Sequence, residues 1–201
     1  MSVQSSTLST PTSPAAASKG QSMIARQAIV NVDKEVIGYE LFNRSRAPAE
    51  HTAATDVLLL FTALSHAGSE DLVGTRLLFV NSTHESLAGG HLELLNPEKV
   101  VLEVEPLGHV AVARLPMLRS LRERGFKLSF NHTVLESAYA TWLPLADYIK
   151  LDLTVLRPEQ LAVLVSYAAR HSKAQLIATK VETQEQFDLL KSIGVSLFQG
   201  Y

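Results

Sequence analysis

Seven polar or charged residues stand out because each interrupts or ends an apolar, strand-like run. They are Glu40, Asn81, Glu103, Lys150, Asp152, Glu182 and Gln199. Oxygen donors of these kinds bind hard divalent cations, and two such ions can clamp a phosphodiester and activate water while a lysine offsets negative charge. If the seven side chains converge, the sequence predicts a metal-assisted phosphodiester site. The alternative, for any one of them, is a polar residue that merely solvates a strand end.

Glu40 is the residue on which this prediction depends most. It lies inside the apolar run V-I-G-Y-E-L-F, and Arg44 follows four residues later. A carboxylate among apolar side chains is costly to desolvate, so a charged partner or a metal ion is expected beside it. A half-buried strand with Glu40 on its solvent face is the alternative. The recurrence of the same pattern along the chain favours the first interpretation.

The spacing of the strand-end residues predicts the architecture that positions them. From Asn81 to Gln199, strand ends recur roughly every 20 to 28 residues, about one strand and one helix each. Apolar strands alternating with amphipathic helices are typical of a parallel sheet covered by helices. Polar residues at the carboxyl ends of such strands predict an α/β fold, a TIM-type (β/α)8 barrel with its site on that face. A doubly wound open sheet is the alternative, but the chain has no G-x-G-x-x-G or P-loop motif.

Hydrophobic periodicity and turn residues predict the individual elements. Strands are expected at 24–32, 36–42, 76–80, 100–104, 126–130, 148–151, 174–178 and 195–198, the first two as a hairpin. Helices are expected at 53–64, 115–124 and 158–169, with a last one opening on the capping-box pair Thr183 and Gln186. No helix follows the last strand, so we expect a barrel that is incomplete at its C-terminus.

Composition narrows the class of protein. The 201 residues include 18 basic and 20 acidic side chains, so no charge excess favours a nucleic-acid or membrane-surface partner. No apolar run approaches the length of a membrane span. The absence of cysteine excludes disulfides and thiolate metal sites and suits a cytoplasmic protein. Residues 1–22 are rich in Ser, Thr, Pro and Ala, so we expect a disordered leader before a single domain at 23–201.

Seven segments of the chain share their order and spacing with a known family. They read R-Q-A-I-V at 26–30, G-Y-E-L-F-N-R at 38–44, F-V-N at 79–81, V-L-E-V-E at 101–105, Y-I-K-L-D at 148–152, K-V-E-T at 180–183 and F-Q-G-Y at 198–201. On these segments the chain resembles the EAL domain, the cyclic di-GMP phosphodiesterase fold, from about Ile24 to Tyr201. It is most similar to the branch fused to HDOD domains, where Glu-Leu-Phe commonly replaces Glu-Ala-Leu.

The resemblance implies a role for each matched residue. The residues that match metal ligands are Glu40, Asn81 and Glu103. The residues that match catalytic groups are Lys150, Asp152 and Glu182. The residues that match contacts to the ligand's guanine or phosphate are Gln27, Arg44 and Gln199. The lysine is the one that helps to hold the attacking water, and Glu182 is the second glutamate of the family's A-E-G-V-E segment.

The chain departs from the family at three acidic positions. Asn131 and His132 stand where active members carry the paired acids of an Asp-Asp-Phe-Gly loop, and Thr179 replaces the first glutamate of A-E-G-V-E. Asn131 can offer only a neutral oxygen, and a histidine nitrogen is a softer donor than magnesium prefers. We therefore expect no tightly bound cofactor, and only weak binding of Mg²⁺ or Mn²⁺ at the remaining metal-ligand positions.

Three functions remain open from the sequence. The first is a catalytically degenerate EAL domain that acts as a regulatory or protein-interaction module in cyclic di-GMP-related signalling, with a protein partner or an HDOD domain beyond Tyr201. The second is a receptor that binds cyclic di-GMP without hydrolysis, which the retained ligand-contact residues favour. The third is a weak residual phosphodiesterase yielding linear pGpG, against which the three lost acids argue. A homodimer is left open, since the lost loop supports the family's dimer interface.

Overall fold

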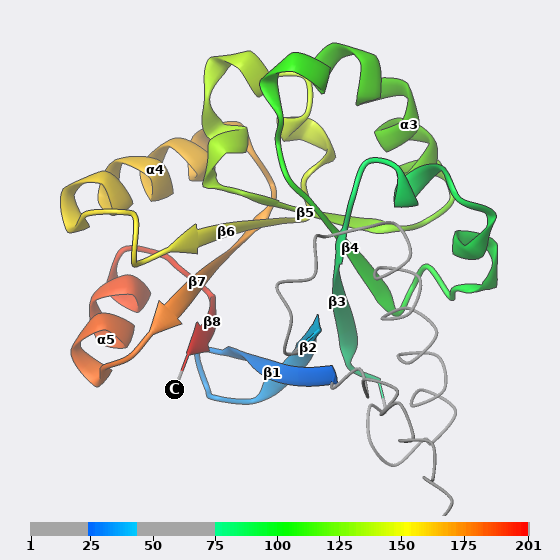
Figure 1. The fold of residues 1–201 in the computed structure, drawn as a ribbon. Coiled ribbons are helices and arrows are strands. Elements are labelled where there is room, and N and C mark those ends of the chain that lie inside the picture. The colour runs from blue at the N-terminus through cyan, green and yellow to red at the C-terminus, as the bar shows by residue number, and fades with distance from the viewer. Residues whose placement is uncertain (1–23, 44–74, 201) are drawn as a thin grey trace, which may run out of the picture.

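Eight strands close into a barrel in the computed structural model, which describes residues 24–43 and 75–200 (Figure 1). The strands are β1 (Ile24–Asn31), β2 (Val36–Asn43), β3 (Leu77–Ser82), β4 (Val100–Val104), β5 (Lys127–Asn131), β6 (Tyr148–Asp152), β7 (Gln175–Val181) and β8 (Leu197–Gly200). Each strand pairs with the next one along the chain, and β8 closes the ring by pairing with β1. β1 is antiparallel to both of its neighbours, whereas β2 to β8 run parallel.

The predicted TIM-type barrel and its opening hairpin are confirmed, and the open-sheet alternative is wrong because the sheet has no free edge. The ring of strands is complete, and no helix follows β8 among the described residues. The predicted helix over 53–64 and the predicted leader over 1–22 lie outside the residues that the structure describes.

Among the described residues, the α-helices lie on the outside of the strands (Figure 1). They are α3 (Ala111–Glu123), α4 (Pro158–His171) and α5 (Gln184–Ser192). α4 opens on Pro158, as predicted, because proline lacks the N–H that the first turn leaves unpaired. α5 opens on the predicted capping box: Thr183 Oγ1 accepts from the Gln186 N–H, and Gln186 Oε1 accepts from the Thr183 N–H, both at 3.2 Å.

α3 begins four residues earlier than predicted. The carbonyl oxygen of Ala111, its first residue, accepts a 2.7 Å hydrogen bond from the indole N–H of the fully buried Trp142, and this tertiary bond anchors the extra turn. Short 3-10 helices fill other connections, at Ser86–Ala88, Gly90–Leu94, Gly108–Val110, His132–Leu135, Ser137–Tyr139 and Leu143–Leu145. Within 24–43 and 75–200, no helix is long and apolar enough to cross a membrane.

Side chains alternate between the inside and the outside of the barrel along each strand. The inward-facing apolar residues form a small buried floor, which consists of Ile29, Phe79, Val101, Tyr148, Ile177 and Leu197. Outward-facing residues such as Val80 and Leu102 join a larger core with the buried faces of the helices. Six predicted site residues stand two positions from floor residues on the same strands and so share the inner face: Gln27, Asn81, Glu103, Lys150, Thr179 and Gln199. The floor therefore supports a polar layer at one end of the barrel.

Asp147 ties the start of β6 to β5 and α3. Its Oδ2 accepts hydrogen bonds from the Leu128 N–H at 2.8 Å and from Arg122 Nη1 at 2.6 Å. Asp147→Asn keeps the shape but removes the charge opposite Arg122. Because this pair is partly exposed, we expect the free energy of unfolding to fall by about 1 kcal/mol in urea denaturation. Asp188→Asn on the exposed face of α5 is the matched control, and an equal loss there would contradict this role.

Candidate functional site

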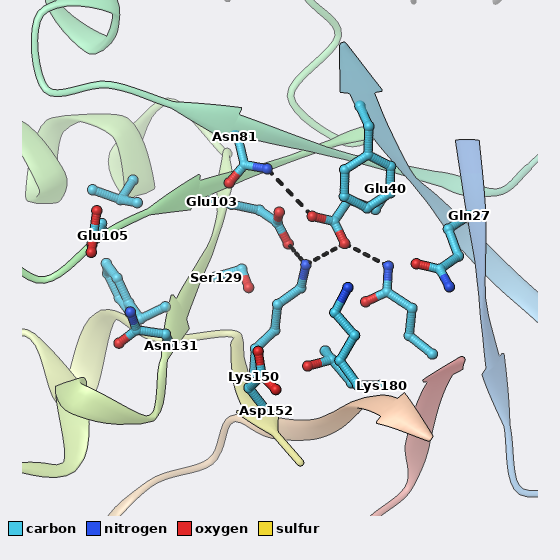
Figure 2. A pocket seen from close by; sticks show the side chains of 15 residues that line it. Gln27, Glu40, Asn81, Glu103, Glu105, Ser129, Asn131, Lys150, Asp152 and Lys180 are labelled. Carbon is cyan, nitrogen blue, oxygen red and sulfur yellow. Dashed lines mark hydrogen bonds and ion pairs between the residues drawn. The ribbon is translucent and has the colours of Figure 1, made fainter. Parts of the chain in front are cut away.

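The polar layer lines a pocket of about 290 Å³ at the carboxyl ends of the parallel strands (Figure 2). All eight strands contribute to its walls. The predicted site residues that line it are Gln27, Glu40, Asn81, Glu103, Asn131, Lys150, Asp152, Thr179 and Gln199. The carboxyl ends of barrel strands meet on one face, which is why residues far apart in sequence gather here. The structure brings these residues together, while their chemical roles stay predictions.

Glu40 on β2 lies at the centre of the hydrogen bonds in this pocket. Its Oε2 accepts from Lys150 Nζ at 2.6 Å and from Gln199 Nε2 at 2.5 Å, while its Oε1 accepts from Asn81 Nδ2 at 3.3 Å (Figure 2). Only 6% of Glu40 is exposed. The partner that a carboxylate in an apolar strand requires is therefore Lys150, 110 residues further along the chain.

Lys150 on β6 joins two buried carboxylates. Its ammonium lies 2.6 Å from Glu40 Oε2 and 2.5 Å from Glu103 Oε1. Burial by itself lowers the pKa of Lys150, but the carboxylates of Glu103 and Glu40 outweigh burial and raise this pKa above its ordinary value. Lys150 is therefore a fixed positive charge between the two acids.

The two carboxylates differ in their titration. Burial raises the pKa of Glu40, yet the Lys150 ammonium and the hydrogen bonds from Lys150 and Gln199 outweigh burial, so this pKa lies below its usual value. Burial dominates at Glu103 and, with the neighbouring Glu40 charge, raises its pKa to about 8 against the pull of Lys150. Glu103 therefore takes up a proton more readily than Glu40, and the two acids titrate as a coupled pair.

The residues present do not fit a centre of two metal ions. Mg²⁺ and Mn²⁺ favour octahedral sites of about six oxygen ligands. Across the described ranges, no group of three or more His, Asp or Glu side chains is placed to hold an ion. The oxygens of Glu40 and Glu103 that would face an ion face the Lys150 ammonium instead. A single ion beside Glu40, Asn81 and Glu103 would have to displace this tethered cation.

Local and cross-strand hydrogen bonds engage the other predicted residues in the pocket. Asn131 Oδ1 and Asp152 Oδ1 each accept from the backbone N–H two residues further on, at 3.0 and 2.8 Å. These bonds turn the chain out of β5 and β6 directly above the pocket. Gln27 Nε2 donates to the carbonyl oxygen of Gly200 at 3.3 Å, which links β1 to β8. Thr179 is buried and offers only a hydroxyl group.

Three predicted site residues are not placed in this pocket. Glu182 follows the end of β7 and lines a second pocket beside α5, where its backbone N–H donates to Gln186 Oε1 at 2.7 Å. The expectation that Glu182 joins the cluster is therefore wrong. His132 begins the 3-10 helix after β5 and lines a groove beside α4 rather than the pocket. Arg44 lies outside the described residues.

Three polar residues of the pocket escaped the sequence analysis. Ser129 and Glu105 each stand two positions from a predicted site residue, so strand alternation could have found them. Lys180 gave no such signal, because it lines the pocket directly after Thr179, whereas neighbours in a regular strand point to opposite faces. The position of Lys180 depends on its backbone φ of 62°, and no residue pattern in the sequence predicts this conformation.

Comparison with known proteins points to one family. No protein-family model matches the chain. Among curated proteins, the chain is 27% identical over 185 residues to the cyclic di-GMP phosphodiesterase CdgJ of Vibrio cholerae, an alignment that covers 89% of the chain and 43% of CdgJ. The chain spans less than half the length of the curated relatives it matches.

Solved structures agree with this sequence similarity. The complex of Klebsiella pneumoniae BlrP1 with calcium and cyclic di-GMP superposes with a TM-score of 0.70 at 25% identity, over 89% of this chain and 54% of BlrP1. The Bacillus subtilis protein YkuI, which has an EAL domain, shares the fold with a TM-score of 0.68 at 23% identity, over 88% of this chain and 53% of YkuI. The chain is therefore similar in sequence to a cyclic di-GMP phosphodiesterase and in fold to proteins with an EAL domain.

Proposed function

We propose that this chain is a catalytically degenerate EAL-type domain, a regulatory module in cyclic di-GMP signalling that binds the dinucleotide without hydrolysing it. The observation that carries the proposal is the donor set of the pocket, in which Asn131 and Thr179 offer no carboxylate.

The loss of charge around this site argues against hydrolysis. Asn131 and Thr179 line the pocket, and both are neutral where the family resemblance aligns acids. A single group that stabilises charge in a transition state typically contributes a factor of about 10² to 10³ in rate. A pocket without these charges is expected to turn over its ligand far more slowly than an active phosphodiesterase. Weak residual activity is the less supported alternative.

The same pocket keeps features that suit a bound phosphodiester. Its walls combine polar donors, such as Gln27 and Lys180, with the rings of Phe42 and Phe130. Concave sites with partly apolar walls and a few convergent polar groups are typical of small-molecule binding. CdgJ is a cyclic di-GMP phosphodiesterase by name, and BlrP1 is solved with cyclic di-GMP, which supports this ligand for the present chain.

A domain that binds its ligand without converting it acts by contacting another protein or another domain. The proposal therefore includes a protein partner or a C-terminal HDOD domain that receives the signal, a cytoplasmic location, and a homodimer as an open option. It also includes weak binding of Mg²⁺ or Mn²⁺ beside Glu40, Asn81 and Glu103. BlrP1 structures with calcium or manganese support a metal in this family, although the tethered ammonium competes with it here.

Two measurements test this function. Calorimetry with cyclic di-GMP in EDTA should give saturable heat, because the donors of the pocket belong to the chain and need no metal. Incubation with excess Mn²⁺ or Mg²⁺, followed by chromatography, should leave the dinucleotide intact, while an active EAL phosphodiesterase run in parallel yields linear pGpG. Comparable turnover by this chain would overturn the non-hydrolysing assignment. Absence of heat, with or without Mn²⁺, would instead leave the protein-interaction module as the better reading.

A further inference from the structure

Lys180 lies in a backbone conformation that lysine rarely adopts. Its φ is 62°, in the left-handed region that disfavours residues with a Cβ. The pairing of β7 with β8 slips at this point: Thr179 pairs with Gln199 and Val181 with Gly200, which leaves Lys180 as an extra residue in β7. Such a bulge re-aims a side chain and is common beside functional sites.

The neighbouring strand holds this bulge in place. An added Cβ on Gly200 would lie 1.8 Å from the carbonyl oxygen of Val181, so only glycine lets β8 approach the bulged part of β7 this closely. Gln27 from β1 donates to the carbonyl of the same glycine. β8 packs against the bulge, and β1 holds β8 through Gln27. The left-handed conformation of Lys180 therefore depends on tertiary packing rather than on local sequence preference.

The bulge gives the pocket a second lysine, whose ammonium has no partner within 24–43 and 75–200. Figure 2 shows Lys180 reaching from β7 into the pocket, on the side opposite Asn81. Among the described residues, no hydrogen bond or ion pair engages Lys180, whereas the Lys150 ammonium is bonded to two carboxylates. Since the Lys150 ammonium is already paired with two carboxylates, Lys180 supplies the positive charge in the pocket that is available to a ligand.

We propose that Lys180 is a phosphate anchor, a side chain whose ammonium binds a phosphate oxygen of the cyclic dinucleotide directly, in place of a metal ion. This inference rests on the proposed receptor function and names how the receptor holds its ligand. An ammonium is a compact charge that donates charge-assisted hydrogen bonds to phosphate. Ligand binding should therefore persist in EDTA and weaken as salt rises, because Lys180 is exposed and its field is screened.

Lys180→Gly tests the anchor, and Lys34→Gly is its matched control. Lys34 is also exposed and also has a positive φ, 63°, but it lies in the turn between β1 and β2, where it donates to Gln184 Oε1 at 3.2 Å. Both changes remove one positive charge and put glycine where a left-handed residue is needed, so neither should lower the melting temperature. By calorimetry in EDTA, we expect Lys180→Gly to weaken cyclic di-GMP binding about tenfold and Lys34→Gly less than about twofold.

The outcomes separate the anchor from the receptor function. Wild-type protein that binds while Lys180→Gly binds equally well would overturn the anchor and leave the receptor intact. Equal losses in the two glycine variants would also overturn it, since the effect would then follow from net charge. Wild-type protein that gives no heat, in EDTA or with Mn²⁺, would overturn both. Restored affinity and restored salt dependence in Lys180→Arg would support the anchor, because arginine keeps the charge.

Discussion

Lys150→Met should lower the free energy of unfolding by roughly 3–5 kcal/mol. Methionine keeps much of the length of the lysine side chain but leaves Glu40 and Glu103, which are 6% and 7% exposed, without their positive partner. Removing one side of a buried ion pair is strongly destabilising, because the remaining acids must stay charged without a partner or take up protons in the folded state. Urea denaturation at neutral pH, followed by circular dichroism, measures this loss.

The pH dependence of this variant distinguishes charge from packing. Without the ammonium, burial and mutual repulsion raise the pKa of each acid in the folded state above its value in the unfolded chain. The penalty is therefore small below the unfolded pKa of about 4.3 and grows as pH rises through the folded pKa values. Lys180→Met is the matched control and should stay within about 0.5 kcal/mol of wild type. A loss that is the same at acid and neutral pH would contradict the electrostatic explanation.

Asn131→Asp combined with Thr179→Glu should raise the affinity for Mn²⁺ on the order of a hundredfold. Asn131 pairs with Lys150 across β5 and β6, and Thr179 pairs with Asp152 across β6 and β7, so both new carboxylates flank the lysine. The added negative charge favours a divalent cation and gives the Lys150 ammonium other partners than Glu40. Calorimetry with Mn²⁺ in the absence of nucleotide measures this change without relying on activity.

His132→Asp is the control for this restoration. It adds one carboxylate, as Asn131→Asp does, one residue further on, but His132 lines the groove beside α4. A charge there is screened from the pocket, so we expect a gain in Mn²⁺ affinity of no more than about threefold. Equal gains from His132→Asp and from the double variant would mean that net charge, rather than ligand geometry, limits metal binding. No gain from the double variant would mean that the neutral residues are not the cause.

Strand periodicity was enough to predict most of the polar layer. Residues two apart on a strand share a face, so Phe79 before Asn81 and Tyr148 before Lys150 already imply an apolar floor beneath polar tips. Regular spacing of the strand ends then implied a barrel that gathers those tips. Both inferences use the regular repeat of the backbone, which can be recognised from the order of apolar and polar residues along the chain.

Periodicity failed where the backbone leaves its regular course. The bulge at Lys180 shifts the register of β7, so Lys180 enters the pocket and Glu182 leaves it. The turn after β5 takes His132 out of the pocket, because Asn131 caps the 3-10 helix that begins at His132. The extra turn of α3 depends on the Trp142 indole, which contacts it from a distant segment.

The sequence by itself determined the barrel, its apolar floor and the identity of most residues around its mouth, because strand alternation and the spacing of strands and helices are local properties. Only the tertiary structure decided how those residues pair. Glu40, Glu103 and Lys150 come from three strands, and the position of one ammonium against two carboxylates follows from barrel closure and burial. The position of Lys180 likewise follows from the bulge in β7 opposite Gly200.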